Sequence, residues 1–309
     1  MSAERTARPR ILITGAAGML GSDLLEILGA RFEARGLDLR PSSAGPGAVV
    51  LCDLTEPGSV RKAFEDFRPG IVFHAAAMTH VDGCERDPET ARRVNVEATG
   101  NVVEAANRTG AAVVFFSTDY VFDGRKGAPY TEKDRPCPLS CYGRTKREAE
   151  ELIESRAGHY VIFRVSWLFG RNGPSFPRTI LERAGSVPSF EVVNDQVGRP
   201  TYTRDVARAL RDLFVRVSWQ AAADRQIFHL GNSGEVSWAD YAEMILESYP
   251  GAKPSVVKIA TPLGHRPAVR PLHSVLALEK AERELGIRLR PWREAVNDFI
   301  KHELIVGQP

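Results

Sequence analysis

Cysteine is scarce in this sequence and forms no recognisable pattern. The 309 residues include only Cys52, Cys84, Cys137 and Cys141, and their spacings match no zinc-binding template. A chain of this length can bury a substantial hydrophobic core without a disulfide framework, and free thiols are typical of proteins in the reducing cytoplasm. We therefore expect a cytoplasmic protein with free cysteines and no metal-binding cluster.

Long apolar runs and a strong charge of one sign are also missing. No run approaches the roughly 18 apolar residues of a membrane-spanning helix, and the apolar stretch at residues 11–13 is too short for a signal peptide. The formal net charge is +2, which gives no strong basic field of the kind that binds nucleic acid. We expect neither a membrane nor a nucleic acid as a partner, and the sequence leaves a homodimer open.

What the sequence does contain is an alternation of short apolar runs with helical patterns. Strands are predicted at residues 10–14, 32–38, 48–52, 71–75, 112–117, 160–165 and 226–230. Helices are predicted at residues 19–30, 57–67, 88–109, 145–155, from the turn at 171–174 to about 185, and at 205–217, 238–248 and from 292. A surface loop is predicted at residues 42–47. This alternation predicts an α/β fold with a doubly wound parallel sheet covered on both faces.

A glycine-rich turn follows the first predicted strand and opens the first helix. Its pattern is G-x-x-G-x-x-G, with Gly15, Gly18 and Gly21 as the glycines and Met19 and Leu20 between the last two. Glycines allow a tight turn and a close approach of a pyrophosphate, and the amides at a helix N-terminus favour an anion. A glycine-rich turn in this strand–turn–helix setting predicts a dinucleotide site.

Asp38 ends the second predicted strand, roughly 20 residues beyond the glycines. An acid at this position accepts hydrogen bonds from the adenosine ribose, which favours NADH because a 2′-phosphate would face a carboxylate. Arg40 lies two residues on and could hold that phosphate. The choice between NADH and NADPH stays open, with a preference for NADH, and an acid in a solvated loop is the alternative for Asp38.

Two further segments follow predicted strands and could line the same site. Asp53 and Leu54 end the third strand, where Asp53 could bond the adenine amino group, or form an Asx turn or helix cap instead. Ala75, Ala76 and Ala77 follow the fourth strand, where small side chains would let a dinucleotide cross closely, although close packing explains them equally well. We expect all five residues to contact the cofactor.

The chain then divides into two predicted parts. Residues 1–170, with returning segments at about 201–232, form the dinucleotide-binding part. From about residue 170 the sequence becomes turn-rich, and residues 254–271 are rich in proline. We expect residues 171–200 and 233–309 to form a smaller, interleaved C-terminal lobe that binds the substrate.

Tyr142 and Lys146 stand four residues apart at the start of a helical pattern, so their side chains share one face. A nearby cation lowers the pKa of a phenol and fits it for proton transfer to a carbonyl oxygen. Thr118 or Ser117, at the carboxyl end of the fifth strand, could hydrogen-bond that oxygen, or cap the strand end. Asn95, within the predicted helix at 88–109, could hold a water near Lys146 or face solvent.

The glycine turn, the acid at the second strand end, the Ser-Thr-Asp-Tyr segment and the Tyr–Lys pair together resemble the extended short-chain dehydrogenase/reductase superfamily. Residues 117–124, 138–146, 163–170 and 193–201, with Arg270, Pro271, Ser274 and Leu276, are similar to the dTDP-4-dehydrorhamnose reductase family. The resemblance implies reduction of dTDP-4-dehydro-L-rhamnose to dTDP-L-rhamnose by a nicotinamide cofactor. It further implies that Tyr142 protonates the C4 oxygen and that Thr118 bonds it. Lys146 would bond the nicotinamide ribose and lower the pKa of Tyr142.

The resemblance also implies a set of substrate contacts, from Thr118, Asp119, Trp167, Asn194, Asp195, Gln196 and Arg270. Trp167 could stack on sugar or base, or anchor the core. The polar residues 194–196 could bind the nucleotide sugar or close a turn by internal hydrogen bonds. Arg270 could neutralise a diphosphate or form a surface ion pair. His273 departs from the family, which often has Asn there, and Gly83 with Cys84 stands where some members carry a lysine.

Two alternative functions remain. The protein could reduce or epimerise another nucleotide-linked deoxysugar, because fold does not fix substrate. It could instead be a non-catalytic, NADP-binding regulatory subunit, since the regulatory subunit of methionine adenosyltransferase resembles the same reductases. The intact Asn194, Asp195 and Gln196 run and Trp167 favour a reductase.

Overall fold

The computed structural model describes residues 10–41, 49–217, 224–249, 251, 253–262, 264 and 266–304. The predicted loop at residues 42–47 lies outside them. At the centre is a sheet in which every neighbouring pair of strands is parallel. Its members are β1 (Ile11–Thr14), β2 (Ala34–Asp38), β3 (Val49–Leu51), β4 (Ile71–His74), β5 (Ala112–Thr118), β6 (Tyr160–Val165) and β11 (Asp224–His229).

The spatial order of these seven strands is β11-β6-β5-β4-β1-β2-β3. The order reverses between β1 and β4, and ligands of such sheets bind at the carboxyl ends of the strands at this point. The predicted α/β fold with a doubly wound parallel sheet is confirmed. β1, β4, β5 and β6 are buried throughout, as expected for strands covered on both faces.

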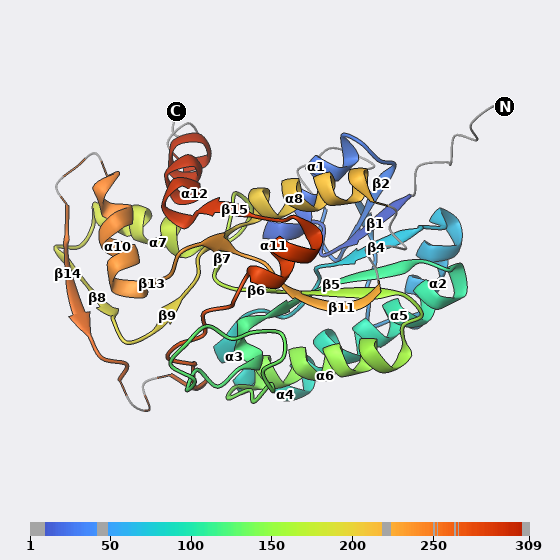
Figure 1. Ribbon diagram of the computed structural model, residues 1–309, viewed down its shortest axis with the longest axis horizontal. Helices are drawn as coiled ribbons and strands as arrows, with labels where there is room; N and C mark the ends of the chain where they lie inside the picture. Colours follow the sequence, from blue (N-terminus) through green and yellow to red (C-terminus); the bar gives the residue numbers. More distant parts are fainter. Residues whose placement is uncertain are drawn as a thin grey trace.

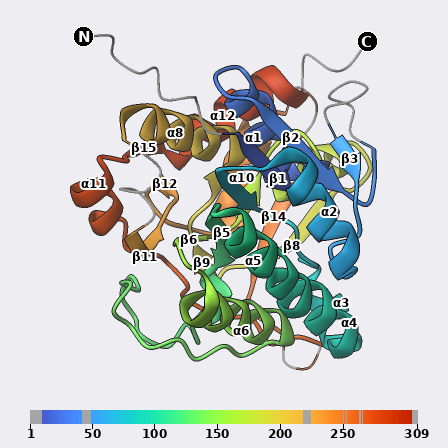
Figure 2. The same cartoon turned by 90° about the vertical axis from the view of Figure 1, so that its right-hand side faces the viewer.

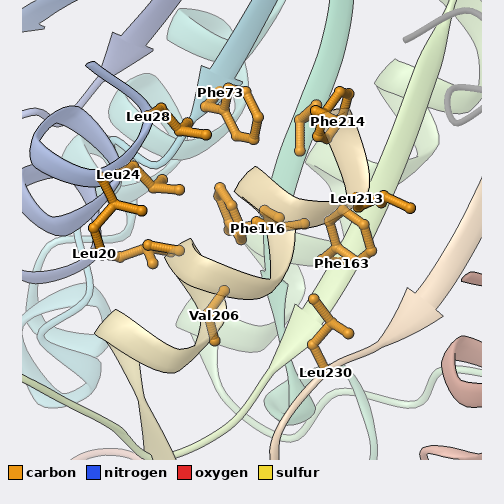
Figure 3. Close-up of a cluster of buried hydrophobic side chains, with 14 of the residues drawn as sticks. Leu20, Leu24, Leu28, Phe73, Phe116, Phe163, Val206, Leu213, Phe214 and Leu230 are labelled. Carbon is orange, nitrogen blue, oxygen red and sulfur yellow. The ribbon is translucent and has the colours of Figure 1, made fainter. Parts of the chain in front are cut away.

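Helices cover both faces of the sheet (Figures 1 and 2). On one face lie α1 (Met19–Gly29) and α8 (Thr203–Arg216), and on the other α2 (Pro57–Phe67), α5 (Ala98–Thr109) and α6 (Cys141–Arg156). In Figure 3, Leu24 and Leu28 of α1 and Phe214 of α8 point toward Phe73 and Phe116 of the sheet. Burial of these large apolar side chains fixes α1, and so the glycine turn before it, against the sheet.

The predicted helix at residues 88–109 is not a continuous α-helix. The segment after β4 forms α3 (Val81–Arg86), α4 (Pro88–Arg92), the π-helical turn η1 (Arg93–Glu97) and then α5. A π-turn inserts one extra residue into a helix and often occurs at functional sites. Here it turns Asn95 inward, where its side chain is 1% exposed.

The helix that carries Tyr142 and Lys146 begins earlier than the predicted bounds of residues 145–155. α6 starts at Cys141 rather than at residue 145, and the hydroxyl of Ser140 accepts a hydrogen bond from Gly143 N at 3.2 Å. Such a cap satisfies an amide that the first helical turn leaves free. Tyr142 therefore lies within the first turn of α6, where its position is fixed by the cap.

Part of the remaining chain packs around a separate apolar cluster, at the left of Figure 1. The rest of the chain outside the central sheet and its covering helices forms small two-stranded sheets and short helices. Its elements are η2 (Asp119–Val121), β7 (Leu168–Phe169), α7 (Phe176–Ala184), β8 (Ser189–Val193), β9 (Val197–Gly198), β10 (Thr201–Tyr202), β12 (Asn232–Ser233), β13 (Val236–Ser237), α10 (Trp238–Glu247), β14 (Ser255–Ile259), α11 (Glu279–Leu285), β15 (Leu289–Pro291), α12 (Trp292–Phe299) and η3 (Ile300–Leu304). Within the described ranges, no helix combines the length and apolar character that crossing a membrane requires.

Candidate active site

The glycine turn between β1 and α1 is built for close approach. Gly15 has φ +69°, which favours glycine, and a Cβ there would lie 2.7 Å from Ala76 N. A Cβ on Gly21 would collide with the carbonyl of Gly15. Gly18 caps α1 without a side-chain hydrogen bond, so the first amides of this helix have no capping side chain. This arrangement fits the pyrophosphate of a dinucleotide.

Asp38 has a structural task that the sequence did not predict. Its Oδ2 accepts a hydrogen bond from Ala17 N at 2.9 Å, and its Oδ1 accepts one from Arg40 N at 3.0 Å. The carboxylate thus ties the end of β2 to the glycine turn. Its side chain is 10% exposed and that of Arg40 is 73% exposed, so Asp38 is not an acid in a solvated loop.

The remaining predicted cofactor residues lie at neighbouring strand ends. Asp53 Oδ1 accepts hydrogen bonds from the amide of Thr55 at 2.8 Å and from its hydroxyl at 2.7 Å, which is an Asx turn. The side chain of Leu54 packs in the apolar core. Ala76 N donates to the hydroxyl of Thr14 at 3.3 Å, beside Gly15. The alanines are therefore packed against the glycine turn, with Ala75 and Ala77 on either side.

Thr118, Tyr142 and Lys146 lie where β5 ends and α6 begins. Thr118 is 5% exposed and Lys146 is 3% exposed, and the side chain of Thr118 lies near the phenol of Tyr142, whose pKa it lowers. Lys146 Nζ lies 3.9 Å from the centroid of the Phe115 ring, a cation–π contact. Thr118 and Tyr142 thus lie near each other at the carboxyl edge of the sheet, and Lys146 follows Tyr142 by one helical turn.

Burial dominates the protonation properties of this site. Burial raises the pKa of Tyr142 well above its ordinary value, and the nearby Thr118 side chain lowers that pKa only in part. Removal of the phenolate from water thus dominates the pKa of Tyr142, and the lowering of that pKa by Lys146 stays a prediction. Burial also lowers the pKa of Lys146 to about 7, and the carboxylate of Glu150 opposes that shift.

A series of buried, hydrogen-bonded side chains joins β1 to α6, the helix that carries Tyr142 and Lys146. Most of these side chains were not predicted from the sequence. His74 Nδ1 lies 2.7 Å from the hydroxyl of Thr14, and His74 Nε2 lies 2.9 Å from that of Thr99. Thr99 donates to the carbonyl of Asn95 at 2.7 Å. Burial and the charge of Lys146 lower the pKa of His74 to about 3, so this ring is neutral at physiological pH.

Asn95 continues this series to α6. Its Oδ1 accepts from Met78 N at 2.8 Å, and its Nδ2 donates to the carbonyl of Met78 at 3.1 Å and to the hydroxyl of Thr145 at 3.0 Å. The alternative that Asn95 faces solvent is wrong. The side chain instead fixes the segment after β4 against the helix that carries Tyr142 and Lys146.

Asp119 is buried beside Thr118. Its Oδ2 accepts a hydrogen bond from the hydroxyl of Ser274, and its Oδ1 accepts one from the hydroxyl of Thr118 at 3.1 Å. Burial raises the pKa of Asp119 to about 7. The carboxyl group of Asp119 thus connects the carboxyl end of β5 to the segment around Ser274, in the C-terminal part of the chain.

Trp167 directly follows β6 and its neighbour Ser166. Its φ is +45°, an uncommon value for a residue with a side chain. The indole stacks on Trp238, with ring centroids 3.5 Å apart and planes 7° apart. A Cβ on Gly198 would collide with the Trp167 ring. The strained backbone and the close stack hold a partly exposed indole in one orientation.

The side chains of residues 194–196 bond residues distant in sequence, and not one another as a turn closed by internal hydrogen bonds would require. Asn194 Oδ1 accepts from the hydroxyl of Ser237 at 2.7 Å. Asp195 accepts from the amide and hydroxyl of Thr261 at 2.9 and 2.7 Å, and Gln196 Nε2 donates to the same hydroxyl at 2.9 Å. These side chains hold the turn between β8 and β9 against the segment after β14.

Arg270 forms a bidentate ion pair with Asp82 of α3, with its Nη2 2.9 Å from Oδ2 and its Nη1 3.2 Å from Oδ1. The two side chains are only 13% and 16% exposed. The pair ties the proline-rich segment to α3. Neighbouring His273 donates its amide to the carbonyl of Gly124 at 3.3 Å.

Residues 9–305 match the model of a protein family described as RmlD substrate binding domain. A dTDP-4-dehydrorhamnose reductase from Burkholderia thailandensis is 36% identical to this chain over 297 residues, which cover 93% of this chain and 96% of that protein. The chain belongs to the dTDP-4-dehydrorhamnose reductase family.

A solved structure agrees. A dTDP-4-dehydrorhamnose reductase from Bacillus anthracis, crystallised in complex with NADP, has a TM-score of 0.85 and 30% identity, and the match covers 95% of this chain and 99% of that one. The predicted family, the predicted fold and the predicted class of oxidoreductase are therefore confirmed.

Members similar to this chain carry more than one named substrate. A probable dTDP-4,6-dihydroxy-2-methyloxan-3-one 4-ketoreductase from Streptomyces antibioticus is 36% identical over 302 residues, which cover 97% of each chain. Its identity to this chain equals that of the dTDP-4-dehydrorhamnose reductase from Burkholderia thailandensis. Membership of the dTDP-4-dehydrorhamnose reductase family thus does not by itself select the sugar.

Proposed function

We propose that this protein reduces the C4 ketone of dTDP-4-dehydro-L-rhamnose to the alcohol of dTDP-L-rhamnose, with NADH or NADPH as the reductant. The observation that carries the proposal is the placement of Thr118, at the carboxyl end of β5, near Tyr142 in the first turn of α6, with Lys146 one helical turn further on. These groups stand at the sheet edge onto which the glycine turn also opens. A ketone bound between these side chains and a nicotinamide would lie next to a proton donor, Tyr142, and a hydride donor, the nicotinamide.

The glycine turn would bind the dinucleotide through Gly15, Gly18, Met19, Leu20 and Gly21, with Ala75, Ala76 and Ala77 beside it. The uncapped first turn of α1 and the positive φ of Gly15 support this assignment. Asp38 would accept hydrogen bonds from the adenosine ribose, and Asp53 and Leu54 would lie near the adenine. When bound, the cofactor supplies a hydride to the ketone carbon.

Tyr142 would donate its proton to the C4 oxygen as negative charge develops there. A phenol whose pKa is raised by burial stays protonated at neutral pH, so the proton is in place before the ketone arrives. Thr118 would hydrogen-bond the same oxygen and stabilise its charge. Lys146 would bind the nicotinamide ribose, and its ammonium would favour the phenolate left after proton transfer.

NADH is the preferred cofactor in this proposal. Both carboxylate oxygens of Asp38 are held by backbone amides, so the negative charge stays where a 2′-phosphate would sit. Arg40, with a 73% exposed side chain, is the group that could still admit NADPH. The solved Bacillus anthracis relative contains NADP, which supports a nicotinamide cofactor without choosing between the two for this chain.

The substrate would lie between the catalytic helix and the C-terminal part. Trp167, held rigidly by Trp238, offers a flat apolar surface for the sugar or base. Arg270 already pairs with Asp82, and a diphosphate would bind the remaining edge of its guanidinium. Asp119, Asn194, Asp195 and Gln196 complete the proposed contacts.

The direct test is to supply dTDP-4-dehydro-L-rhamnose, made in place by the enzymes that precede it, and to follow the oxidation of NADH and of NADPH separately. Rapid oxidation with dTDP-L-rhamnose as the product is the expected result, with NADH the faster of the two. Turnover only with another dTDP-linked keto-sugar would replace the substrate. Tight binding of the cofactor without oxidation of any such ketone would instead favour a regulatory subunit.

A further inference from the structure

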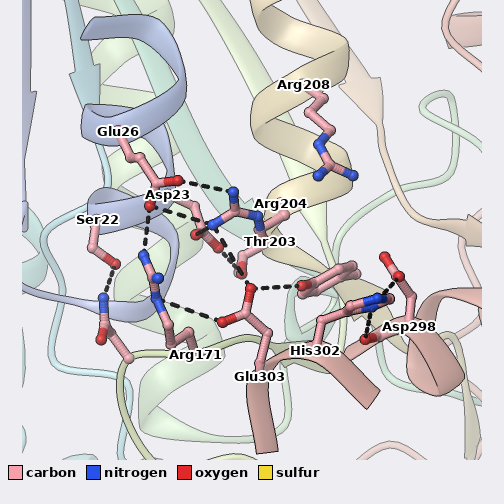
Figure 4. Close-up of polar contacts among 12 residues, drawn as sticks. Ser22, Asp23, Glu26, Arg171, Thr203, Arg204, Arg208, Asp298, His302 and Glu303 are labelled. Atoms are coloured by element: carbon pink, nitrogen blue, oxygen red, sulfur yellow. Dashed lines mark hydrogen bonds and ion pairs between the residues drawn. The ribbon is translucent and has the colours of Figure 1, made fainter. Parts of the chain in front are cut away.

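The outer face of α1 carries a polar cluster that joins three segments distant in sequence (Figure 4). Ser22, Asp23 and Glu26 lie on the first two turns of α1. They contact the loop after β7 and the start of α8. Arg171 of that loop and Arg204 of α8 in turn pair with Glu303 of η3 near the C-terminus. α1 is the helix that opens at the glycine turn, so the cluster lies directly behind the proposed pyrophosphate site.

Asp23 is the buried centre of this cluster. It is 1% exposed, and its Oδ2 accepts a hydrogen bond from the hydroxyl of Thr203. Arg204 Nη1 lies 3.5 Å from Oδ1 of Asp23, and Arg204 Nη2 lies 2.8 Å from Oε1 of Glu26. A buried carboxyl group is costly unless it is paired, and both of its partners here come from the start of α8.

The loop at residues 170–173 is docked on the same face. Asn172 Nδ2 donates to the hydroxyl of Ser22 at 2.8 Å, and Arg171 pairs with Glu26 and with Glu303, whose Oε2 is 3.7 Å from Arg171 Nε. The hydroxyl of Thr203 also lies 3.2 Å from the carbonyl of Phe169. The cluster therefore fixes both ends of this loop.

The loop in turn packs against Met19, the first residue of α1. A Cβ on Gly170 would lie 3.0 Å from Met19 Cγ and would collide with the Thr203 hydroxyl. A Cβ on Gly173 would lie 3.9 Å from Met19 Cε. Met19 belongs to the glycine turn, so the position of the loop bears directly on the groups that face a dinucleotide.

We propose that Asp23, through Thr203 and Arg204, is a positioning residue that holds the 170–173 loop against Met19 and thereby sets the affinity for the dinucleotide. The inference rests on the proposed function only in that the glycine turn binds NADH or NADPH. Asp23 does not touch the cofactor. It acts by keeping the loop and the first turn of α1 in one fixed arrangement, which removes the entropy cost of ordering them on binding.

Two substitutions break the contact with little change in shape, Asp23→Asn and Thr203→Val. Asp23→Asn removes the negative charge that pairs with Arg204, and Thr203→Val removes the hydroxyl that donates to Asp23. We expect either change to raise the Kd for NADH, measured by fluorescence titration, about 10-fold. The kcat at saturating NADH should stay within about two-fold, because the catalytic groups lie on α6 and β5. A loss of folded protein alone would not separate KM for the cofactor from kcat in this way.

The matched control is Asp205→Asn. Asp205 is also a buried acid near the start of α8, 8% exposed, but it bonds Asn232 and Arg290, each at 2.8 Å. This variant should lose similar stability and keep the Kd for NADH within about two-fold. If Asp23→Asn does not fold, Thr203→Val and Asn172→Ala carry the test, the latter with an expected rise in Kd of about three-fold.

Unchanged Kd values in Asp23→Asn and Thr203→Val would overturn the inference, as would an equal loss of affinity in Asp205→Asn. Failure of the wild-type protein to bind NADH or NADPH would remove the proposed cofactor site itself. These two failures are distinct, because the first leaves wild-type binding intact.

Discussion

Glu150 of α6 accepts two hydrogen bonds from Arg164 of β6, from Nε to Oε1 and from Nη2 to Oε2, each at 2.8 Å. Neither side chain is more than 1% exposed. Glu150 stands one helical turn beyond Lys146 in α6, so this buried ion pair anchors α6 to the sheet. It also places a negative charge where it opposes the loss of the proton from Lys146.

Replacement of Glu150 by Gln should therefore destabilise the protein strongly, because Arg164 is left as a buried charge with too few partners. We expect the free energy of unfolding, measured by urea denaturation, to fall by about 3–5 kcal/mol. The double variant Glu150→Gln with Arg164→Met should recover most of that loss. A loss below about 1 kcal/mol in the single variant would contradict the anchoring role.

The pKa of Lys146, lowered by burial to about 7 from an ordinary 10.5, predicts a pH effect. Between these values the unfolded chain binds a proton at Lys146 that the folded protein does not, so stability rises with pH. In Lys146→Met this contribution disappears. The stability of the wild-type protein relative to that variant should rise by roughly 1.4 kcal/mol per pH unit from about pH 7 to 9. Denaturation curves at several pH values that give a constant difference would refute the shift.

Tyr142→Phe should leave the affinity for the cofactor nearly unchanged and lower turnover by at least about 10²-fold, because only the proton donor is removed. Tyr160→Phe is the control, since Tyr160 is also buried but begins β6 at the opposite end of the strand. Steady-state rates with both variants test the assignment. Near-normal turnover in Tyr142→Phe would remove this residue as the acid.

Asn95→Ala should destabilise the protein by about 3 kcal/mol, because it leaves the amide and carbonyl of Met78 without their partner. Asn107→Ala removes two hydrogen bonds of similar length at an exposed site on α5 and should cost less than about 1 kcal/mol. Chemical denaturation measures both. Equal losses of stability in the two variants would show that the buried Asn95 stabilises the fold no more than the exposed Asn107 does.

Gly198→Ala should displace Trp167 from its stack on Trp238, because the added methyl group would collide with the indole. The KM for the nucleotide sugar should rise about 10-fold, with the Kd for the cofactor unchanged. Gly58→Ala, where the methyl group meets open space, should change neither constant. A normal KM in Gly198→Ala would argue that Trp167 is a core anchor and no more.

The sheet was predictable because local chemistry dictates it. β1, β4, β5 and β6 are short apolar runs buried on both faces, and each is followed by a helical pattern. The glycine turn was predictable for the same reason, since its spacing and its strand–turn–helix setting are local. The start of α6 was missed because Ser140, its cap, precedes the residues that read as helix.

Contacts between distant residues were not predictable from the sequence. His74 meets Thr99, Glu150 meets Arg164, and Asp23 meets Thr203 only after the chain has folded. The spacing of apolar and polar residues along one strand or helix does not indicate which distant residues will pair. For the same reason, Asp38 and residues 194–196 were recognised as candidate binding residues, but the residues to which their side chains hydrogen-bond were not predicted.

Hydride transfer to C4 with Tyr142 as the proton donor is tested most directly with NADH that carries deuterium at the reactive position of the nicotinamide. The purified protein would be mixed with dTDP-4-dehydro-L-rhamnose and the product examined by mass spectrometry and NMR. We expect dTDP-L-rhamnose with deuterium at C4 for the wild-type protein and at least about a 10²-fold slower appearance of it for Tyr142→Phe. Bound cofactor with no deuterium in the sugar, or equal rates for the two proteins, would contradict this mechanism.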